Sequence, residues 1–150
     1  MTIKSAVLAT LLLGCCAAPA FAEPGCPLLP AGSGLQWQLS SGSGLTICKA
    51  VDAAGNRVLG VMLTGKEPEL NQPRRNRAEK ATIAGQEVRW YRTEIANQPG
   101  AQDRLTMVEL GPDRYAQIWV YAPDADTAAQ RVRLASQLDF ERSATVAASP

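Results

Sequence analysis

The sequence predicts an α+β fold, a twisted antiparallel sheet of about six or seven strands with one C-terminal amphipathic helix packed on one face. Between residues 35 and 122, apolar side chains recur mainly at every second position, and turn residues separate the runs. A period of two residues is typical of β-strands. After Pro123 the apolar period changes to about 3.6 residues, which is typical of an α-helix.

The first strands are expected to form an antiparallel meander. Three apolar runs predict them, at residues 35–39, 45–52 and 58–63. Residues 52–56 supply turn residues between the last two runs and predict a hairpin. Residues 65–80 are polar, contain Pro68 and Pro73 and have no apolar period, so we expect a long surface loop there.

The second half of the sheet is expected to contain two hairpins. Its strands are predicted at residues 81–83, 87–95, 105–110 and 115–122. Residues 111–114 are expected to join the last two strands, because Pro112 presets the backbone angle of the first central turn position and Asp113 suits the second.

The helix is expected to begin near Asp124 or Asp126, since either side chain can cap the first turn. Its apolar residues fall on one face and are Ala128, Val132, Ala135 and Leu138. This face is predicted to pack on the sheet. Residues 143–150 are small and polar without any pattern, so we expect a disordered tail there.

Residues 1–22 have the features of a signal peptide. Lys4 supplies the positive charge, and residues 6–14 are apolar but too short to span a bilayer. Ala20 and Ala22 are the small residues that a signal peptidase needs at its cleavage site. We therefore expect a periplasmic or secreted protein.

Cleavage after Ala22 leaves a mature chain in which residues 23–142 are expected to form a single domain. A lipoprotein signal is the alternative, because Leu12-Leu13-Gly14-Cys15 fits one and would make Cys15 the acylated first residue. In that case the protein would be anchored to a membrane. Against lipidation, Cys16 would remain beside the anchor as an extra thiol in an oxidising compartment.

Two cysteines, Cys26 and Cys48, remain after cleavage at Ala22, and we expect them to form a disulfide. The ring that they close contains about 23 residues and would stabilise the fold by about 3 to 4 kcal/mol, mainly by restricting the unfolded chain. The bridge would also hold the N-terminal segment against the sheet. Two cysteines without any histidine do not suggest a metal site, and no cofactor is expected.

The charges of the chain nearly balance, with 15 basic and 14 acidic residues, and removal of Lys4 makes them equal. A nucleic-acid-binding protein needs a basic surplus that releases counterions, so nucleic acid is not an expected partner. Beyond the signal, no stretch approaches the roughly 18 consecutive apolar residues of a membrane-spanning helix. We therefore expect no transmembrane segment in the mature chain.

The absence of histidine excludes the Ser-His and Cys-His nucleophile pairs and histidine acid–base catalysis. Carboxylate chemistry, such as that of glycosidases, is what remains for an enzyme. The candidate carboxylates are Glu67, Glu69, Glu87, Glu94 and Glu109. Glu67 and Glu69 lie in a loop predicted to be solvated, where nothing raises a carboxyl pKa, and we expect the protein not to be an enzyme.

The best candidate contact site is the basic run Arg74, Arg75 and Arg77, followed by Lys80, in the long predicted loop. Guanidinium groups bind anionic partners through several hydrogen bonds, and long loops often carry function. The alternative is that this charge run is merely solvated, since Glu67, Glu69 and Glu79 dilute its field.

Aromatic residues suggest a second candidate contact. Adjacent side chains of a strand point to opposite faces, so Trp90 and Tyr91 face opposite ways, whereas Trp119 and Tyr121 share a face. We expect Trp90 and Trp119 in the core, and we keep Tyr91 and Tyr121 as candidates for both core and contact. Exposed aromatic rings beside arginines are typical of protein interfaces.

The sequence therefore predicts a non-catalytic exported domain that binds another macromolecule of the cell envelope, such as an inhibitor, an immunity protein or an assembly accessory protein. Its partner is expected to be an envelope or secreted protein. One alternative is a carrier that holds a small apolar ligand between helix and sheet. The other is a carboxylate hydrolase that works without histidine.

Overall fold

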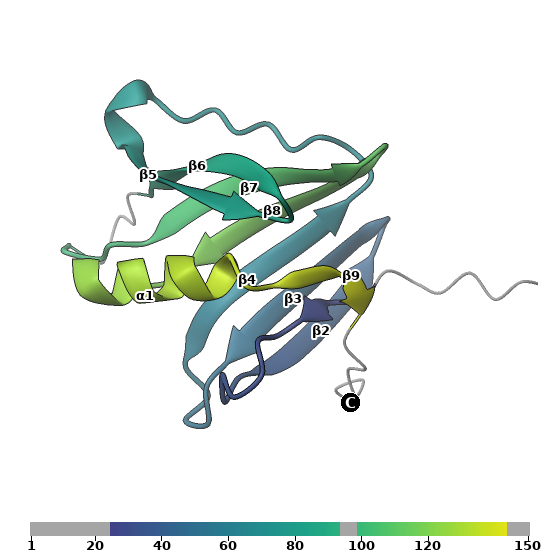
Figure 1. Ribbon diagram of the computed structural model, residues 1–150, viewed down its shortest axis with the longest axis horizontal. Helices are drawn as coiled ribbons and strands as arrows, with labels where there is room; N and C mark the ends of the chain where they lie inside the picture. The colour runs from purple at the N-terminus through teal and green to yellow at the C-terminus, as the bar shows by residue number, and fades with distance from the viewer. Residues whose placement is uncertain (1–24, 94–98, 144–150) are drawn as a thin grey trace, which may run out of the picture.

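The computed structural model describes residues 25–93 and 99–143, and Figure 1 shows their arrangement. Its elements are β1 (Pro27–Leu28), β2 (Gln36–Gly42), β3 (Leu45–Val51), β4 (Arg57–Thr64), the 3-10 turn η1 (Arg74–Asn76), β5 (Arg77–Ile83), β6 (Gln86–Arg92), β7 (Arg104–Gly111), β8 (Arg114–Val120), α1 (Ala125–Ala135) and β9 (Asp139–Ser143). The expected signal peptide, residues 1–22, and residues 144–150 of the expected tail lie outside the described residues.

A seven-stranded antiparallel sheet forms the body of the protein, in the order β2-β3-β4-β8-β7-β6-β5. The single described helix, α1, packs against one face, where it contacts β8, β4 and β5. The predicted fold class is therefore confirmed. β4 and β5 run in the same direction with three strands between them, so the connection after β4 carries the chain along the length of the sheet (Figure 1).

The core lies between the helix and the face of the sheet that it covers. It is lined by Cys48, Ala50, Leu59, Val61, Trp90, Val108, Ala116, Ile118 and Val120 from the sheet and by Val132, Ala135 and Leu138 from the C-terminal segment. The alternation that predicted the strands explains this set, because its members in β3, β4 and β8 lie two residues apart along each strand. Trp90, expected in the core, is fully buried there.

Asp124 begins the helix as its N-cap. Its carboxylate accepts hydrogen bonds from the backbone N–H of Thr127 at 2.7 Å and from the Thr127 hydroxyl at 3.0 Å. These bonds hold the pKa of Asp124 below its ordinary value of 3.8. Ala128, Val132 and Ala135 are buried, as the periodicity predicted, whereas Leu138 packs on the core from beyond the last helical turn.

The hairpin of β7 and β8 turns at Pro112 and Asp113, as the sequence predicted. Asp113 adopts a φ of 52°, and aspartate tolerates this left-handed region better than most residues. The turn brings Gly111 opposite Arg114, after a register shift that follows Glu109.

The long loop is shorter than predicted, because β5 begins at Arg77 rather than at residue 81. Its first residues are mostly polar and the strand lies at the edge of the sheet, so alternation alone did not reveal it. Long-range contacts hold it instead: Glu79 accepts a hydrogen bond from Nε of Arg104 at 3.1 Å, and the Arg89 guanidinium donates to the carbonyl of Ala78.

A second, two-stranded sheet pairs β1 with β9, and neither strand was predicted. Both are short and almost without apolar alternation. The predicted disulfide between Cys26 and Cys48 is present, with Cα atoms 5.7 Å apart and both residues fully buried. Together with a 2.7 Å hydrogen bond from the Trp37 indole to the carbonyl of Pro27, it holds the N-terminal segment against the sheet, as expected.

Candidate functional site

One row of side chains crosses the whole sheet on the face turned away from the helix. The register pairs Gln38 with Lys49, Lys49 with Gly60, Gly60 with Trp119, Trp119 with Leu105, Leu105 with Tyr91, and Tyr91 with Arg77. Directly paired residues share a face of a sheet. This row therefore places two large aromatic rings between basic side chains at either side, and we call the surface around it the outer face.

Arg77 and Lys80 belong to β5 rather than to a loop, but both lie on the outer face. Arg77 pairs with Tyr91, and Lys80 pairs with Arg89 two residues earlier on β6. The extra residue of β5 between these pairs forms a bulge, which keeps both cations on one face. The structure thus brings Tyr91, which the sequence had suggested separately, together with Arg77 and Lys80 of the basic run.

Tyr121 follows β8 and shares the face of Trp119, two residues earlier. Its backbone N–H donates to the carbonyl of Val58 at 3.1 Å, which continues the pairing with β4. The guanidinium carbon of Arg57 lies 4.9 Å from the centre of the Tyr121 ring. This distance is within the range of a cation–π contact, so a further cation adjoins the aromatic side chains of the outer face.

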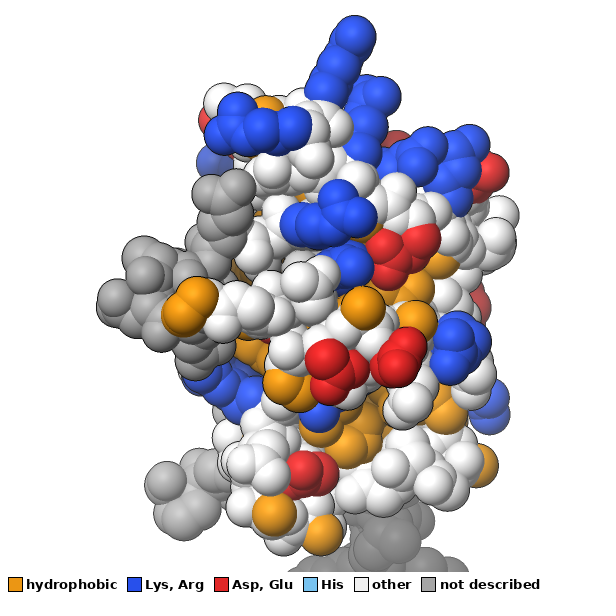
Figure 2. Space-filling model, turned by 90° about the vertical axis from the view of Figure 1, so that its left-hand side faces the viewer, with side chains coloured by type: hydrophobic (Ala, Val, Ile, Leu, Met, Phe, Trp, Pro, Cys, Tyr) orange, Lys and Arg blue, Asp and Glu red, His pale blue; other side chains and the backbone are white. Residues whose placement is uncertain are grey.

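Arg74 and Arg75 form η1, immediately before β5, and both are exposed. Figure 2 shows Lys and Arg side chains gathered at the upper end of the molecule, where Figure 1 places η1 and β5. Among the described residues, neither of these arginines nor Arg77 forms an ion pair. Lys80 differs, because its ammonium lies 2.5 Å from the carboxylate of Glu87.

Trp119 is half-buried and lies on the outer face, not in the core as expected. Its strand neighbours Ile118 and Val120 occupy the buried face, so the register leaves the indole no place there. The sequence did contain a signal for this position of Trp119. Apolar residues alternate along the strand with Tyr115, Gln117 and Tyr121, and Trp119 falls in register with this second set. Lys49 and Arg57 also belong to this surface and were not predicted as site residues.

The pKa shifts that are resolved among the described carboxylates, those of Asp52, Glu87, Asp124 and Asp139, are all downward. Lys80 lowers the pKa of Glu87 through a hydrogen bond, and the Arg142 side chain likewise lowers that of Asp139. Glu67, Glu69 and Glu109 are exposed, while Glu94 lies outside the described residues. A general acid at neutral pH needs a raised carboxyl pKa, which burial or a neighbouring negative charge produces.

Within residues 25–93 and 99–143, no group of three or more metal-ligating side chains is placed to hold a metal ion. The helix that these residues contain is too short and too polar to cross a membrane. No protein-family model matches the chain, and neither a curated protein nor a solved structure matches it. Within the part of the chain that the structure describes, the fold and the outer face define an α+β protein whose sheet carries basic and aromatic side chains on the face opposite the helix.

Proposed function

We propose that this protein is a non-catalytic binding domain of the cell envelope, and that its outer face binds an acidic surface of another envelope protein. The observation that carries the proposal is the continuous row from Lys49 through Trp119 and Tyr91 to Arg77, on the face that the helix leaves uncovered. Arginine, tyrosine and tryptophan are the residues that contribute most to protein interfaces.

The distribution of charge favours an acidic partner. Arg74, Arg75 and Arg77 are exposed cations at one end of the outer face, and Lys49 is an exposed cation within the row. Cations at the rim of an interface speed the encounter with a partner of opposite charge, and this effect weakens as salt screens it.

The described carboxylates give no support to an enzyme, since the pKa shifts resolved among them are downward.

Export by a signal peptide at residues 1–22 is part of this proposal. The buried disulfide between Cys26 and Cys48 supports it, because structural disulfides persist mainly in oxidising compartments. The intact mass of the protein purified from cells tests it. The expected mass is that of a free periplasmic or secreted chain beginning at Glu23. The mass of a chain beginning at Cys15 with a diacylglycerol adduct would show instead that the protein is anchored to a membrane.

Charge reversal on the two faces tests the binding surface. Lys49→Glu changes an exposed side chain of the outer face, and Arg133→Glu makes the same change on the exposed side of α1. The parent protein would first be used to isolate a partner from envelope extract. The binding kinetics of this partner would then be measured on both variants and on the triple variant Arg74→Ala, Arg75→Ala, Arg77→Ala. Surface substitutions of this kind are expected to leave the melting temperature nearly unchanged.

The expected result is a lower association rate and a flatter salt dependence for Lys49→Glu and for the triple variant, with Arg133→Glu unchanged. Equal association rates for Lys49→Glu and Arg133→Glu would contradict binding at the outer face. Unchanged kinetics of the triple variant alone would remove η1 and Arg77 from the contact and leave Lys49, Tyr91 and Trp119 as its centre.

A further inference from the structure

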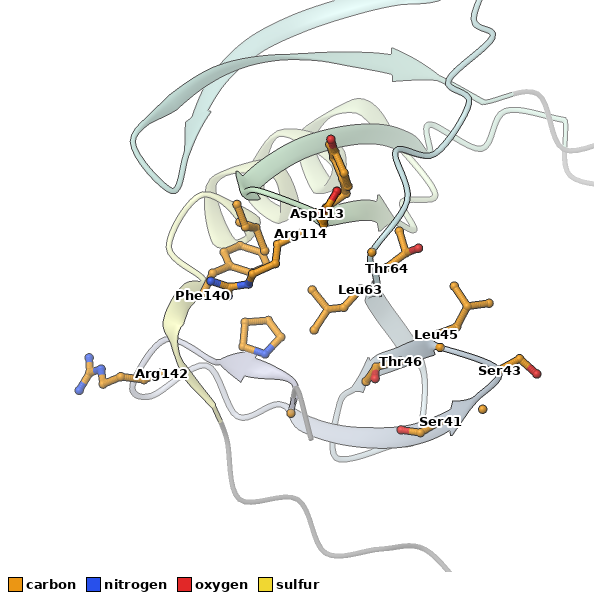
Figure 3. Close-up of a pocket in the computed structure, with 17 residues that line it drawn as sticks. Ser41, Ser43, Leu45, Thr46, Leu63, Thr64, Asp113, Arg114, Phe140 and Arg142 are labelled. Carbon is orange, nitrogen blue, oxygen red and sulfur yellow. The ribbon is translucent and has the colours of Figure 1, made fainter. Parts of the chain in front are cut away.

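A pocket of about 530 Å³ lies between the small β1–β9 sheet and one end of the large sheet. Its wall comes from the turns of β2–β3 and β7–β8, from the end of β4 and from β9 (Figure 3). This volume is within the range of pockets that hold small molecules. No residue of α1 lines it, so it differs from the space between helix and sheet that the sequence suggested for a carrier.

Apolar side chains form much of this wall. Leu63 of β4, Leu110 of β7 and Phe140 of β9 line the pocket, and the first two pack against the core. Leu45, the large apolar side chain that stands out as exposed among the described residues, also lines it. Burying such surface under a ligand is favourable at roughly 25 cal/mol per Å². The pocket therefore suits an apolar molecule.

The charged groups around the pocket favour an anion at its mouth. Arg114 is exposed, and in Figure 3 its side chain extends towards Phe140. Arg114 forms no ion pair within the described residues, whereas Arg142, the other cation of the lining, is 2.6 Å from Asp139 and points away in Figure 3. Asp113 is the lining carboxylate, and Figure 3 shows it apart from the guanidinium of Arg114.

We propose that this pocket binds a small amphipathic anion, with its apolar chain against Leu63, Leu110 and Phe140 and its anionic group at Arg114. This site is separate from the outer face, so it does not depend on the proposed partner. A fatty acid and an anionic phospholipid share this chemistry, because each joins an apolar acyl chain to an anionic group, a carboxylate in the first and a phosphate in the second. Free octanoate and vesicles that contain an anionic phospholipid distinguish the two sources.

Calorimetric titration of the disulfide-bonded protein with three probes of equal chain length tests the charge preference. The probes are octanoate, 1-octanol and octyltrimethylammonium, each below its aggregation concentration. We expect one octanoate per chain, weaker binding of octanol and the weakest binding of the cation. Arg114→Met should weaken octanoate binding about fivefold and leave octanol unchanged, because an exposed ion pair contributes modestly. Arg133→Met, at an exposed position of α1, is the charge control.

A pair of neighbouring substitutions tests the position of the ligand. Ser41 lines the pocket, whereas Ser40 pairs with Ile47 and belongs to the other face of the sheet. Ser41→Trp should fill the space and abolish binding of octanoate and octanol alike, while Ser40→Trp should bind both as the parent does. Tryptophan emission and melting curves of both variants verify that they fold.

Three outcomes would overturn the proposal. The first is equal binding of octanoate and octyltrimethylammonium by the parent, and the second is equal binding by the Ser40→Trp and Ser41→Trp variants. The third is a concentration-dependent dimer, seen by sedimentation, that Ser41→Trp disrupts, since a second copy would then occupy the pocket. Binding to anionic vesicles without any binding of octanoate would assign the pocket to membrane lipid and reject the free acid.

Discussion

Gly60 of β4 lies directly opposite Trp119 of β8, and a Cβ atom at position 60 would lie 3.2 Å from Cε3 of the indole. The glycine therefore leaves room for the edge of the indole ring next to β4 on the outer face. A methyl group at this position would push the ring outward by a few tenths of an ångström. The conformation of Trp119 thus depends on the absence of a side chain one strand away.

Gly60→Ala is expected to change the fluorescence of Trp119 with little loss of stability. The half-buried ring can shift towards solvent, and alanine in place of glycine restricts the unfolded chain, which offsets the displacement. Emission spectra and thermal melts measure the two effects. Gly42→Ala is the control, because a Cβ there meets nothing within 4 Å. Identical spectra for both variants would mean that position 60 does not determine the position of the ring.

The ion pair between Glu79 and Arg104 is expected to stabilise the protein, because the Arg104 side chain is only 7% exposed. A double-mutant cycle with Glu79→Ala and Arg104→Met should give a coupling energy of about 2 kcal/mol in urea unfolding. The cycle Lys80→Ala with Glu87→Ala is the comparison, since those side chains are 53% and 65% exposed. We expect no measurable coupling there, and similar coupling in both cycles would refute the argument from burial.

Replacement by phenylalanine should destabilise the protein less at Trp90 than at Trp37, although Trp90 is the more buried of the two. Trp90 is fully buried, but its indole N–H has no hydrogen-bond partner among the described residues. Trp90→Phe removes this unsatisfied donor, which offsets the small cavity that it creates, and should cost less than about 1 kcal/mol. Trp37→Phe removes the hydrogen bond to Pro27 and should cost more. Chemical denaturation compares the two, and the reverse order would contradict this account.

The helix cap predicts a dependence of stability on pH. The backbone N–H of Thr127 donates to Asp124 and lowers the pKa of that carboxyl below 3.8. The folded state therefore gains stability from the ionised carboxylate above the ordinary pKa, and it loses this gain as the pH falls through the lowered value. Asp124→Ala should lower the melting temperature at about pH 7, and the deficit should shrink as the pH falls below the ordinary pKa of 3.8.

Asp126→Ala is the control for this prediction, because Asp126 lies in the first turn of the same helix without being its cap. Its effect on the melting temperature should be smaller at neutral pH. A deficit for Asp124→Ala that stays constant down to about pH 2 would show that the charge of the cap contributes nothing.

The elements that the sequence predicts well are those whose signals are local. The turn at Pro112 and Asp113 and the cap at Asp124 depend on a few neighbouring residues, so they could be read directly. β9 and the start of β5 could not, since they are held by partners far along the chain. Leu28 of β1 pairs with Asp139 of β9, for example, and the start of β5 is held by the hydrogen bond between Glu79 and Arg104.

The candidate site shows the same division. Arg77, Tyr91 and Tyr121 could be proposed one by one, because arginine and aromatic side chains are typical of interfaces. Their position on one face depends on the bulge in β5 and on the pairing of β6 with β7 and of β4 with β8. Strand order of this kind follows from the packing of the whole core, which alternation within one strand does not specify.

The pairing of β1 with β9 brings Pro27 opposite Ser143, so the first and last described strands leave the fold side by side. A short linker could therefore join the two ends, and the chain could be reopened between β4 and η1, where no strand pairing would be cut. Such a circularly permuted protein would start near β5 and finish with β4. It would keep the sheet order and give the protein an N-terminus near η1, away from the pocket, whereas its new C-terminus would follow β4, whose last residues line the pocket.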